Sequence, residues 1–346
     1  SRAACNGMSE PAIKDLLKSW NRYIKYHYTD TGYRAIQKLS EEEREEVMSV
    51  AMVPIDFNNE KFRDDQFILG NLLIPSRDRI SVETKSTAFK VGRKCVIASA
   101  HHLYGQLEDP IVPNAVPSID ANAARVIPPL VFERLYVDAN GNPLKSSTQG
   151  SVLFQMTRPS DWVVANEGKS RRFKFGSDLV LIKLDGPGDA YYKKIVVETP
   201  QSIEARIKDK TLGILINCQG SPQHLTKKKF SENCSGDEYK WQQLAARAYM
   251  VDPLSSSGVI TNVTGSKGMS GGACGLGDDN KSVFGVVLHG PGKIGDRQVL
   301  PDPRFDPEHW ASSGPTYLGL FDEMDRRIKG NFPGVESLAD LNKICD

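Results

Sequence analysis

The sequence has no excess of charge of one sign. Its 44 Lys and Arg residues stand against 43 Asp and Glu residues, so the formal net charge is +1 at pH 7. A nearly neutral chain carries no overall field that would draw it to nucleic acid or to an anionic membrane. We therefore expect neither nucleic acid nor a membrane among its partners.

Long hydrophobic runs are also absent from the sequence. The most apolar stretches, such as Ile214–Ile216, have the length of a strand, whereas a transmembrane helix needs about 20 apolar residues. We expect no membrane span. Residues 1–7 lack the apolar core of a signal peptide and the chain begins with Ser, so we interpret it as processed or trimmed.

Cysteine is sparse in this sequence. Six cysteines in 346 residues are too few for a disulfide framework, and none has the spacing of a structural zinc site. We interpret them as mostly reduced thiols, with one or two disulfides left open, and we expect no metal. Reduced thiols indicate the cytoplasm or another reducing compartment.

What the sequence does contain is the composition of a globular protein. Apolar residues make up 39% and charged residues 25% of the chain, and its length allows about two or three domains. Apolar residues recur at helical spacing from Ile13 to Ile24, and Ser40–Glu43 has the form of a capping box. We predict a helical N-terminal extension over residues 1–60, which is a candidate surface for self-association.

From Phe67 onward the sequence is typical of an all-β protein. Short β-type runs alternate with clusters of Gly, Pro, Asn and Asp. Residues 185–189 form a predicted linker between two halves of the β region. The predicted strands are Phe67–Ile74, Thr87–Val91, Lys94–Ala98, Leu179–Leu184, Thr211–Asn217, Gln243–Val251, Gly258–Val263 and Ser282–Leu288, and short C-terminal helices are predicted at Phe321–Lys329 and Ser337–Ile344.

The segment Gly265–Ala273 carries the strongest chemical signal. In it, Ser270 is preceded by Gly268 and followed by Gly271 and Gly272. Glycine lets the backbone turn sharply, and N–H groups at such a turn can converge on one oxygen, as the oxyanion of an acyl transfer requires. A glycine-rich turn whose serine has no function is the competing interpretation of this segment alone.

A serine nucleophile needs a base and an acid that orients the base. The run Cys95–His101 is a strand of small and apolar residues that ends in His, and Asp178 precedes the apolar run Leu179–Leu184. In the order His101, Asp178, Ser270, these residue types match a nucleophile, base and orienting acid. His102 is a rival for the base.

Three segments of the chain resemble the signature segments of the chymotrypsin-like serine proteases. They are Ala98–His101, Asp178–Leu181 and Gly268–Gly272, and the resemblance covers roughly residues 65 to 320. It implies an all-β core of two antiparallel six-stranded barrels with the active site in the cleft between them. The implied division is a helical extension (1–60), a first barrel with His101 and Asp178 (61–187), a second barrel with Ser270 (188–320) and a C-terminal helical tail (321–346).

The resemblance also implies the role of each residue. It makes Ser270 the nucleophile, His101 the general base and Asp178 the residue that orients the imidazole, in a serine endopeptidase that needs no cofactor. The N–H groups of Gly268 and Ser270 would form the oxyanion hole. The partner would be a protein or peptide substrate.

The chain departs from secreted members of that family at two points, and from compact members in one spacing. His102 stands where those members have Cys, so we expect the framework disulfides to be absent, as in intracellular, bacterial and viral members. Met269 replaces the acidic residue that pairs with a freshly cut N-terminus, so we expect no activation by that ion pair. The long step from His101 to Asp178 implies an insertion within residues 107–174.

Substrate selection is implied by three further positions. Thr264 falls at the base of the S1 pocket, where it cannot balance the buried charge of Lys or Arg. His289 falls beside the pocket, and Gly290 would pair with the backbone of the substrate. We expect an uncharged, aliphatic or aromatic P1 residue, with Gln or Glu as the runner-up.

Two other functional classes compete with this interpretation. A non-catalytic, protease-like binding scaffold would keep all three residues of the triad but lose their geometry. The string Gly268–Gly272 also fits the nucleophile elbow of an α/β-hydrolase-type esterase. That motif must open a helix, and the residues after Gly272 do not favour one.

Overall fold

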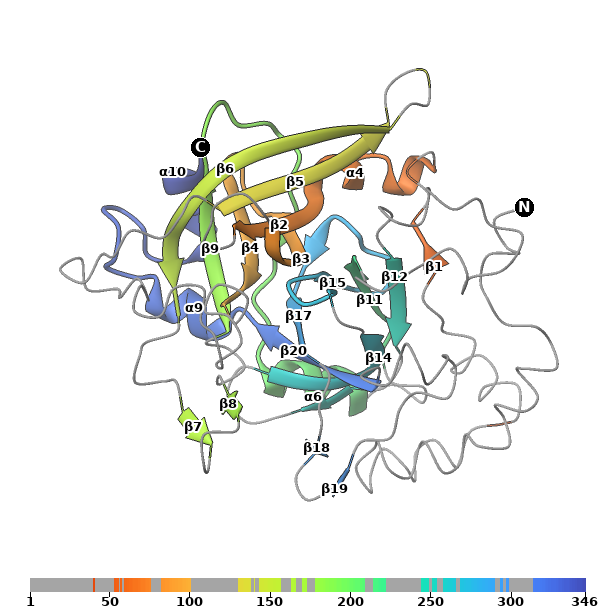
Figure 1. Cartoon of the computed structure of the whole chain (residues 1–346). Helices are drawn as coiled ribbons and strands as arrows, with labels where there is room; N and C mark the ends of the chain where they lie inside the picture. Colours follow the sequence, from red (N-terminus) through yellow and green to blue (C-terminus); the bar gives the residue numbers. More distant parts are fainter. Residues whose placement is uncertain are drawn as a thin grey trace.

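In the computed structural model of the protein, strands make up most of the described part of the chain and a few short helices lie around them (Figure 1). The structure describes residues 40, 53–55, 57, 59–75, 82–100, 130–137, 140, 143–156, 163–165, 170–172, 178–208, 214–221, 244–248, 251–253, 258–265, 268–289, 293–294, 297–298 and 314–346. The predicted helices before residue 53 lie outside these ranges, so the helical extension and the domain boundaries stay predictions.

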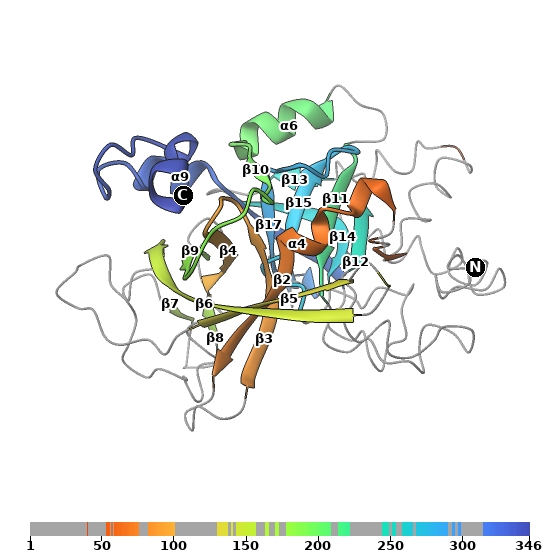
Figure 2. The same cartoon turned by 90° about the horizontal axis from the view of Figure 1, so that it is seen from above.

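Six antiparallel strands form a closed barrel, in the order β2-β3-β4-β9-β6-β5 (Figure 2). The predicted strand Leu179–Leu184 is confirmed with the same bounds, and the middle of the predicted insertion supplies two barrel strands. The bounds of the six are β2 Leu69–Pro75, β3 Val82–Lys90, β4 Cys95–Ser99, β5 Leu130–Val137, β6 Pro143–Gln155 and β9 Leu179–Leu184.

Alternate residues of these strands point to opposite sides of the barrel wall. Ala98 and Val180 line an apolar interior, whereas Ile97 and Leu181 belong to a cluster shared with the second sheet. Because β4 and β9 are buried on both faces, their sequences are almost continuously apolar. The interior comprises Leu72, Ala88, Val96, Ala98, Ala100, Leu130, Phe132, Val180, Ile182 and Leu184.

The second half of the β region is an eight-stranded sheet, in the order β1-β12-β11-β15-β17-β20-β14-β13. The second six-stranded barrel is therefore not confirmed. Strands β12 and β14 lie close to each other, but β1 pairs with β12 and β13 pairs with β14, so these outer strands occupy the edges at which a barrel would close. The bounds are β1 Val53–Pro54, β11 Ile216–Gly220, β12 Leu244–Ala248, β13 Val251–Pro253, β14 Gly258–Gly265, β15 Ala273–Leu276, β17 Gly285–His289 and β20 Gly314–Leu320.

Several short elements surround the two sheets. Helix α6 was not predicted, although a reciprocal capping pair between Thr199 and Ser202 and a proline in its first turn mark its start. The helices are η2 Glu60–Phe62, α4 Asp65–Ile68, α6 Pro200–Lys208, α9 Asp322–Arg327, η6 Leu338–Asp340 and α10 Asn342–Cys345, and the minor strands are β7 Val163–Ala165, β8 Ser170–Arg172, β10 Lys194–Ile195, β16 Ser282–Val283, β18 Lys293–Ile294 and β19 Arg297–Gln298. Short C-terminal helices were thus correctly predicted. No helix within the described ranges is long and apolar enough to cross a membrane.

Two disulfides correct the prediction of mostly reduced thiols without a disulfide framework. Cys95 in β4 is bonded to Cys345 in α10, and Cys218 in β11 is bonded to Cys274 in β15. The partners are 250 and 56 residues apart, so only the folded arrangement brings them together. The expectation of a reducing compartment loses its premise, since every cysteine in the described part of the chain is paired.

The linker after β9 is held to the closed barrel by charge. The carboxylate of Asp189 contacts the ammonium group of Lys90 from β3 and lies 3.0 Å from the guanidinium of Arg134 from β5. Burial by itself raises the pKa of Asp189, but hydrogen bonds from Lys90, from the Tyr191 N–H and from Arg134 outweigh it and hold the pKa below its ordinary value. These contacts therefore fix the direction in which the chain leaves the closed barrel after β9.

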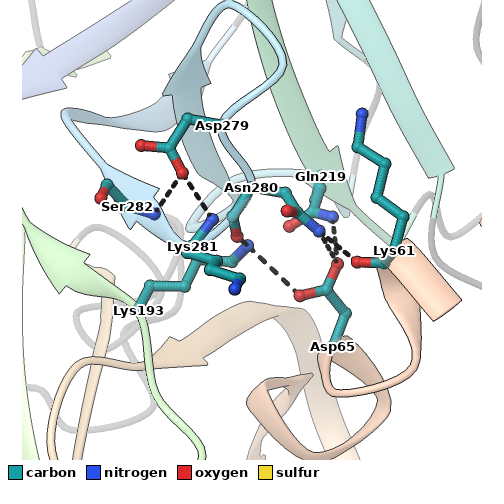
Figure 3. Close-up of polar contacts among 8 residues, drawn as sticks. All are labelled: Lys61, Asp65, Lys193, Gln219, Asp279, Asn280, Lys281 and Ser282. Carbon is teal, nitrogen blue, oxygen red and sulfur yellow. Dashed lines mark hydrogen bonds and ion pairs between the residues drawn. The ribbon is translucent and has the colours of Figure 1, made fainter.

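A buried polar cluster fastens the next part of this segment to α4 and the second sheet (Figure 3). The Lys193 ammonium lies 3.4 Å from Asp65, and the two side chains are 2% and 3% exposed. Gln219, at the end of β11, donates to the other oxygen of Asp65 at 2.8 Å, and Lys193 also donates to the carbonyl of Asn280. Burial lowers the pKa of Lys193, and the negative charge of Asp65 opposes this effect.

Candidate active site

The predicted nucleophile lies on a tight turn between β14 and β15. Gly268 has a φ of +99° and Gly271 a φ of +90°, which is a conformation that glycine adopts at low cost. The side chain of Met269 between them is fully buried in the apolar cluster of the second sheet. The prediction that glycines allow a sharp turn around Ser270 is thus consistent with the backbone, and Met269 serves as an apolar anchor of the turn.

Three successive peptide units of this turn are each held by a hydrogen bond. The N–H of Thr87, from β3, donates to the carbonyls of both Gly268 and Ser270 at 3.1 Å. The N–H of Gly272 donates to the Met269 carbonyl at 2.9 Å, and the N–H of Gly271 donates to Val287 of β17 at 2.6 Å. The direction of the amide groups in the turn is therefore fixed by both sheets.

The N–H groups of Gly268 and Ser270 differ from their neighbours in the turn. Within the described ranges neither of them donates a hydrogen bond, although the carbonyls around them accept. The hydroxyl of Ser270 is partly buried and donates to the backbone carbonyl of Leu288 in β17. Backbone donors beside a hydroxyl form an arrangement that can stabilise negative charge on an oxygen.

The turn is packed against the closed barrel. A Cβ atom at Gly271 would lie 1.9 Å from the carbonyl oxygen of Thr87 and 3.4 Å from the backbone nitrogen of Ser99, the last residue of β4. A Cβ atom at Gly272 would lie 2.1 Å from the carbonyl oxygen of Gln219. The serine turn therefore fits between β3, β4 and β11 only because both positions are glycine.

Asp178 lies beside the end of β4, directly before β9. It is 1% exposed, and its carbonyl accepts a hydrogen bond from the N–H of Ala100 at 3.2 Å. Ser99 and Ala100, which precede position 101, thus lie against the serine turn and against Asp178, respectively. His101 itself and its rival His102 lie outside the described residues, so the structure describes neither contact of the predicted base.

The structure describes only the backbone of two of the predicted specificity positions. Thr264 lies near the end of β14, opposite Pro315 in β20, and His289 ends β17, opposite Tyr317 in β20. Strand β20 runs between them, so these two positions flank it. Gly290 lies outside the described residues.

Thr87 is a site residue that sequence reasoning missed. Its side chain is fully buried, and its hydroxyl donates to the Gly268 carbonyl and accepts from the Ser221 N–H, both at 2.8 Å. The sequence gives no signal for it, because most residues of β3 are polar. Among the described residues no group of three or more His, Cys, Asp or Glu could hold a metal ion.

The chain is similar in fold to solved structures of proteases at low sequence identity. The thermostable serine protease AL20 from an extremophilic microorganism is 12% identical with a TM-score of 0.41, over 75% of this chain and 93% of that one. The protease Anisep from Arthrobacter nicotinovorans is 13% identical with a TM-score of 0.39, over 73% and 89%. The active form of the Rv3671c protease from M. tuberculosis is 12% identical with a TM-score of 0.39, over 82% and 88%. No family model and no curated protein matches the chain.

Proposed function

We propose that this protein is a serine endopeptidase that hydrolyses peptide bonds through an acyl-enzyme on Ser270. The observation that carries the proposal is the meeting of three segments at the end of β4. The backbone at Ser99 lies against the serine turn, and Ala100 is hydrogen-bonded to Asp178. This arrangement supports His101 as the base, because the two residues that precede it in the chain contact the segments of the proposed nucleophile and acid.

In the proposed reaction the Ser270 oxygen attacks the carbonyl carbon of the scissile bond while His101 takes the hydroxyl proton. His101 then gives that proton to the leaving amine, and water hydrolyses the ester by the same steps. Buried Asp178 would hold the imidazole tautomer and stabilise its positive charge. The Ser270 hydroxyl would first leave the Leu288 carbonyl, which requires rotation about one side-chain bond at a cost of about 1 kcal/mol for the hydrogen bond.

The oxyanion of the tetrahedral intermediate would be bound by the N–H groups of Gly268 and Ser270. The Ser270 N–H shares a peptide with the Met269 carbonyl, which accepts from the N–H of Gly272, so this donor would need little reorganisation during the reaction. Each such donor contributes roughly 10²–10³ in rate in serine proteases. This pre-set geometry supports a catalytic protein over a scaffold that has only kept the residues.

We further propose that the eight-stranded sheet takes the place of the second chymotrypsin-like barrel. β12 and β14 are the outer two of the six central strands of this sheet. Their closeness supports the proposal, because it brings the two edges of these six strands toward each other, as in a barrel. The substrate would be a protein or peptide, with Gly290 pairing with its backbone. The esterase alternative is disfavoured, since β15 begins at Ala273, where a nucleophile elbow would need a helix.

A fluorophosphonate probe tests the proposal, because it reacts with an activated serine. We expect the native protein to be labelled and Ser270→Ala to be unlabelled at nearly unchanged melting temperature. His101→Ala should also be unlabelled, whereas His102→Ala should keep most of the labelling. If the folded native protein is not labelled, the binding scaffold is the correct class; if His102→Ala is the inactive variant, the base is His102.

A further inference from the structure

The hydroxyl of Thr87 lies at the junction of three segments that are remote in sequence. It belongs to β3 of the closed barrel, donates to Gly268 in the serine turn and accepts from Ser221 at the end of β11. The side chain has no exposed surface. A buried hydroxyl that both donates and accepts has its hydrogen-bonding capacity largely used, so this contact is specific to Ser or Thr at position 87.

The backbone of Thr87 acts on the same turn. Its N–H is shared between the carbonyls of Gly268 and Ser270. The Gly268 carbonyl therefore receives two donors from one residue, one from the backbone and one from the side chain. Gly268 also has a φ of +99°. Because glycine has no Cβ atom, its backbone has more conformational freedom than that of other residues, and external contacts must restrict it.

We propose that Thr87 is a positioning residue for the oxyanion hole, and that its hydroxyl fixes the peptide between Gly268 and Met269, which lies in the chain between the N–H groups of Gly268 and Ser270. This inference rests on the proposed function. The N–H of Thr87 alone would not hold the turn in one orientation, because it is shared between the carbonyls of Gly268 and Ser270. The hydroxyl, which is also held by Ser221, makes one orientation preferred.

The chain offers a matched set of variants to test this role. Thr87→Val keeps the shape and the strand preference but removes both hydrogen bonds of the hydroxyl. Thr87→Ser keeps the hydroxyl and removes only a methyl group. Ser86→Ala removes a buried hydroxyl from the neighbouring position of β3, and that hydroxyl has no hydrogen-bond partner among the described residues.

Peptide hydrolysis and the rate of fluorophosphonate labelling give the catalytic readout. We expect Thr87→Val to lower kcat and the labelling rate by about tenfold or more, with KM changed by less than about threefold, because the oxyanion donors act in the transition state. Thr87→Ser should recover most of the rate, and Ser86→Ala should behave as the native protein. A normal kcat in Thr87→Val, or a loss that Thr87→Ser does not recover, overturns the inference.

Amide hydrogen exchange of residues 268–272 gives a readout that does not depend on activity. We expect faster exchange of this segment in Thr87→Val, with native exchange in Thr87→Ser and in Ser86→Ala. Unchanged exchange in Thr87→Val means that the hydroxyl does not hold the turn, and the inference is then wrong. If the native protein is unlabelled but exchange responds as expected, the proposed function fails while the structural role of Thr87 stands.

Discussion

The backbone of Gly271, in the serine turn, lies directly against the carbonyl oxygen of Thr87, in β3. A Cβ atom at position 271 would come within 1.9 Å of that oxygen, and the φ of the glycine is +90°. Two independent constraints thus exclude any larger residue. One is the steric limit set by β3, and the other is the backbone conformation that turns the chain after Ser270.

Replacement of this glycine should remove activity and stability together. We expect Gly271→Ala to lower the free energy of unfolding by about 2–5 kcal/mol, from backbone strain and overpacking combined, and to abolish fluorophosphonate labelling. Gly277→Ala is the control, because Gly277 has a φ of +62° but no atom lies within 4 Å of the place that an added methyl group would take. It should cost only about 1 kcal/mol. Urea unfolding measures both values, and equal effects would contradict the steric argument.

The disulfide between Cys95 and Cys345 should contribute strongly to stability. The double variant Cys95→Ala/Cys345→Ala should lose about 2–5 kcal/mol, because the bond restricts a long loop in the unfolded chain. Thermal unfolding with and without reductant measures the effect. The native protein should lose stability in millimolar reductant, whereas the double variant should lose much less, since only Cys218–Cys274 remains in the described part. Native stability that is insensitive to complete reduction would contradict this role.

Acid should weaken the attachment of the linker through Asp189. Its pKa in the folded protein is below the ordinary value of 3.8. At a pH between the pKa of the folded state and that of the unfolded state, the unfolded chain therefore binds more protons than the folded one. The stability that Asp189 contributes is therefore fully present above about pH 4 to 5 and is lost as the pH falls through the folded pKa.

The melting temperature at pH 7, 5, 4 and 3 tests this linkage. Asp189→Asn should be less stable than the native protein at pH 7, because the buried ammonium of Lys90 loses its partner, and the difference should narrow toward pH 3. Asp185→Asn is the control on the same linker, at an exposed carboxylate. A constant difference across the series would show that Asp189 does not act through its charge.

Substrate preference should follow the polarity of position 264. We expect a P1-diverse peptide library to be cleaved after uncharged, aliphatic or aromatic residues, because Thr264 cannot balance a buried cation. Thr264→Asp should shift kcat/KM toward Lys and Arg by about tenfold or more. Dominant cleavage after Lys or Arg by the native protein would refute the argument, whereas cleavage after Glu or Gln that disappears in His289→Ala would favour the runner-up.

Strands that carry their own signal could be predicted from the sequence, and strands stabilised by a partner could not. β9 is buried on both faces, so its run Leu179–Leu184 is unmistakably apolar. β6 is long and largely polar, with several exposed residues between Leu144 and Gln149. Its conformation comes from pairing with β5 along Leu130–Val137, and this information is not local. The whole region was for that reason interpreted as an insertion.

The candidate site divides in the same way. The glycines around Ser270 and the apolar run after Asp178 made these two residues candidates, and their roles stay predictions. The contribution of Thr87 arises from a hydrogen bond between residues 181 positions apart, which no spacing rule contains. The same is true of the disulfide between Cys95 and Cys345, because the packing of the C-terminal helices on β4 brings the two cysteines together.

The bond between Cys95 and Cys345 closes a covalent ring that includes most of the chain, and Cys218–Cys274 closes a smaller ring inside it. Ser270 belongs to both rings. A single cut of any peptide bond between residues 95 and 345 would open a ring without releasing a fragment. If the proposed function holds, the protein meets its own copies as possible substrates, and one such cut would leave the molecule in one piece. The break would become visible as two bands only after reduction.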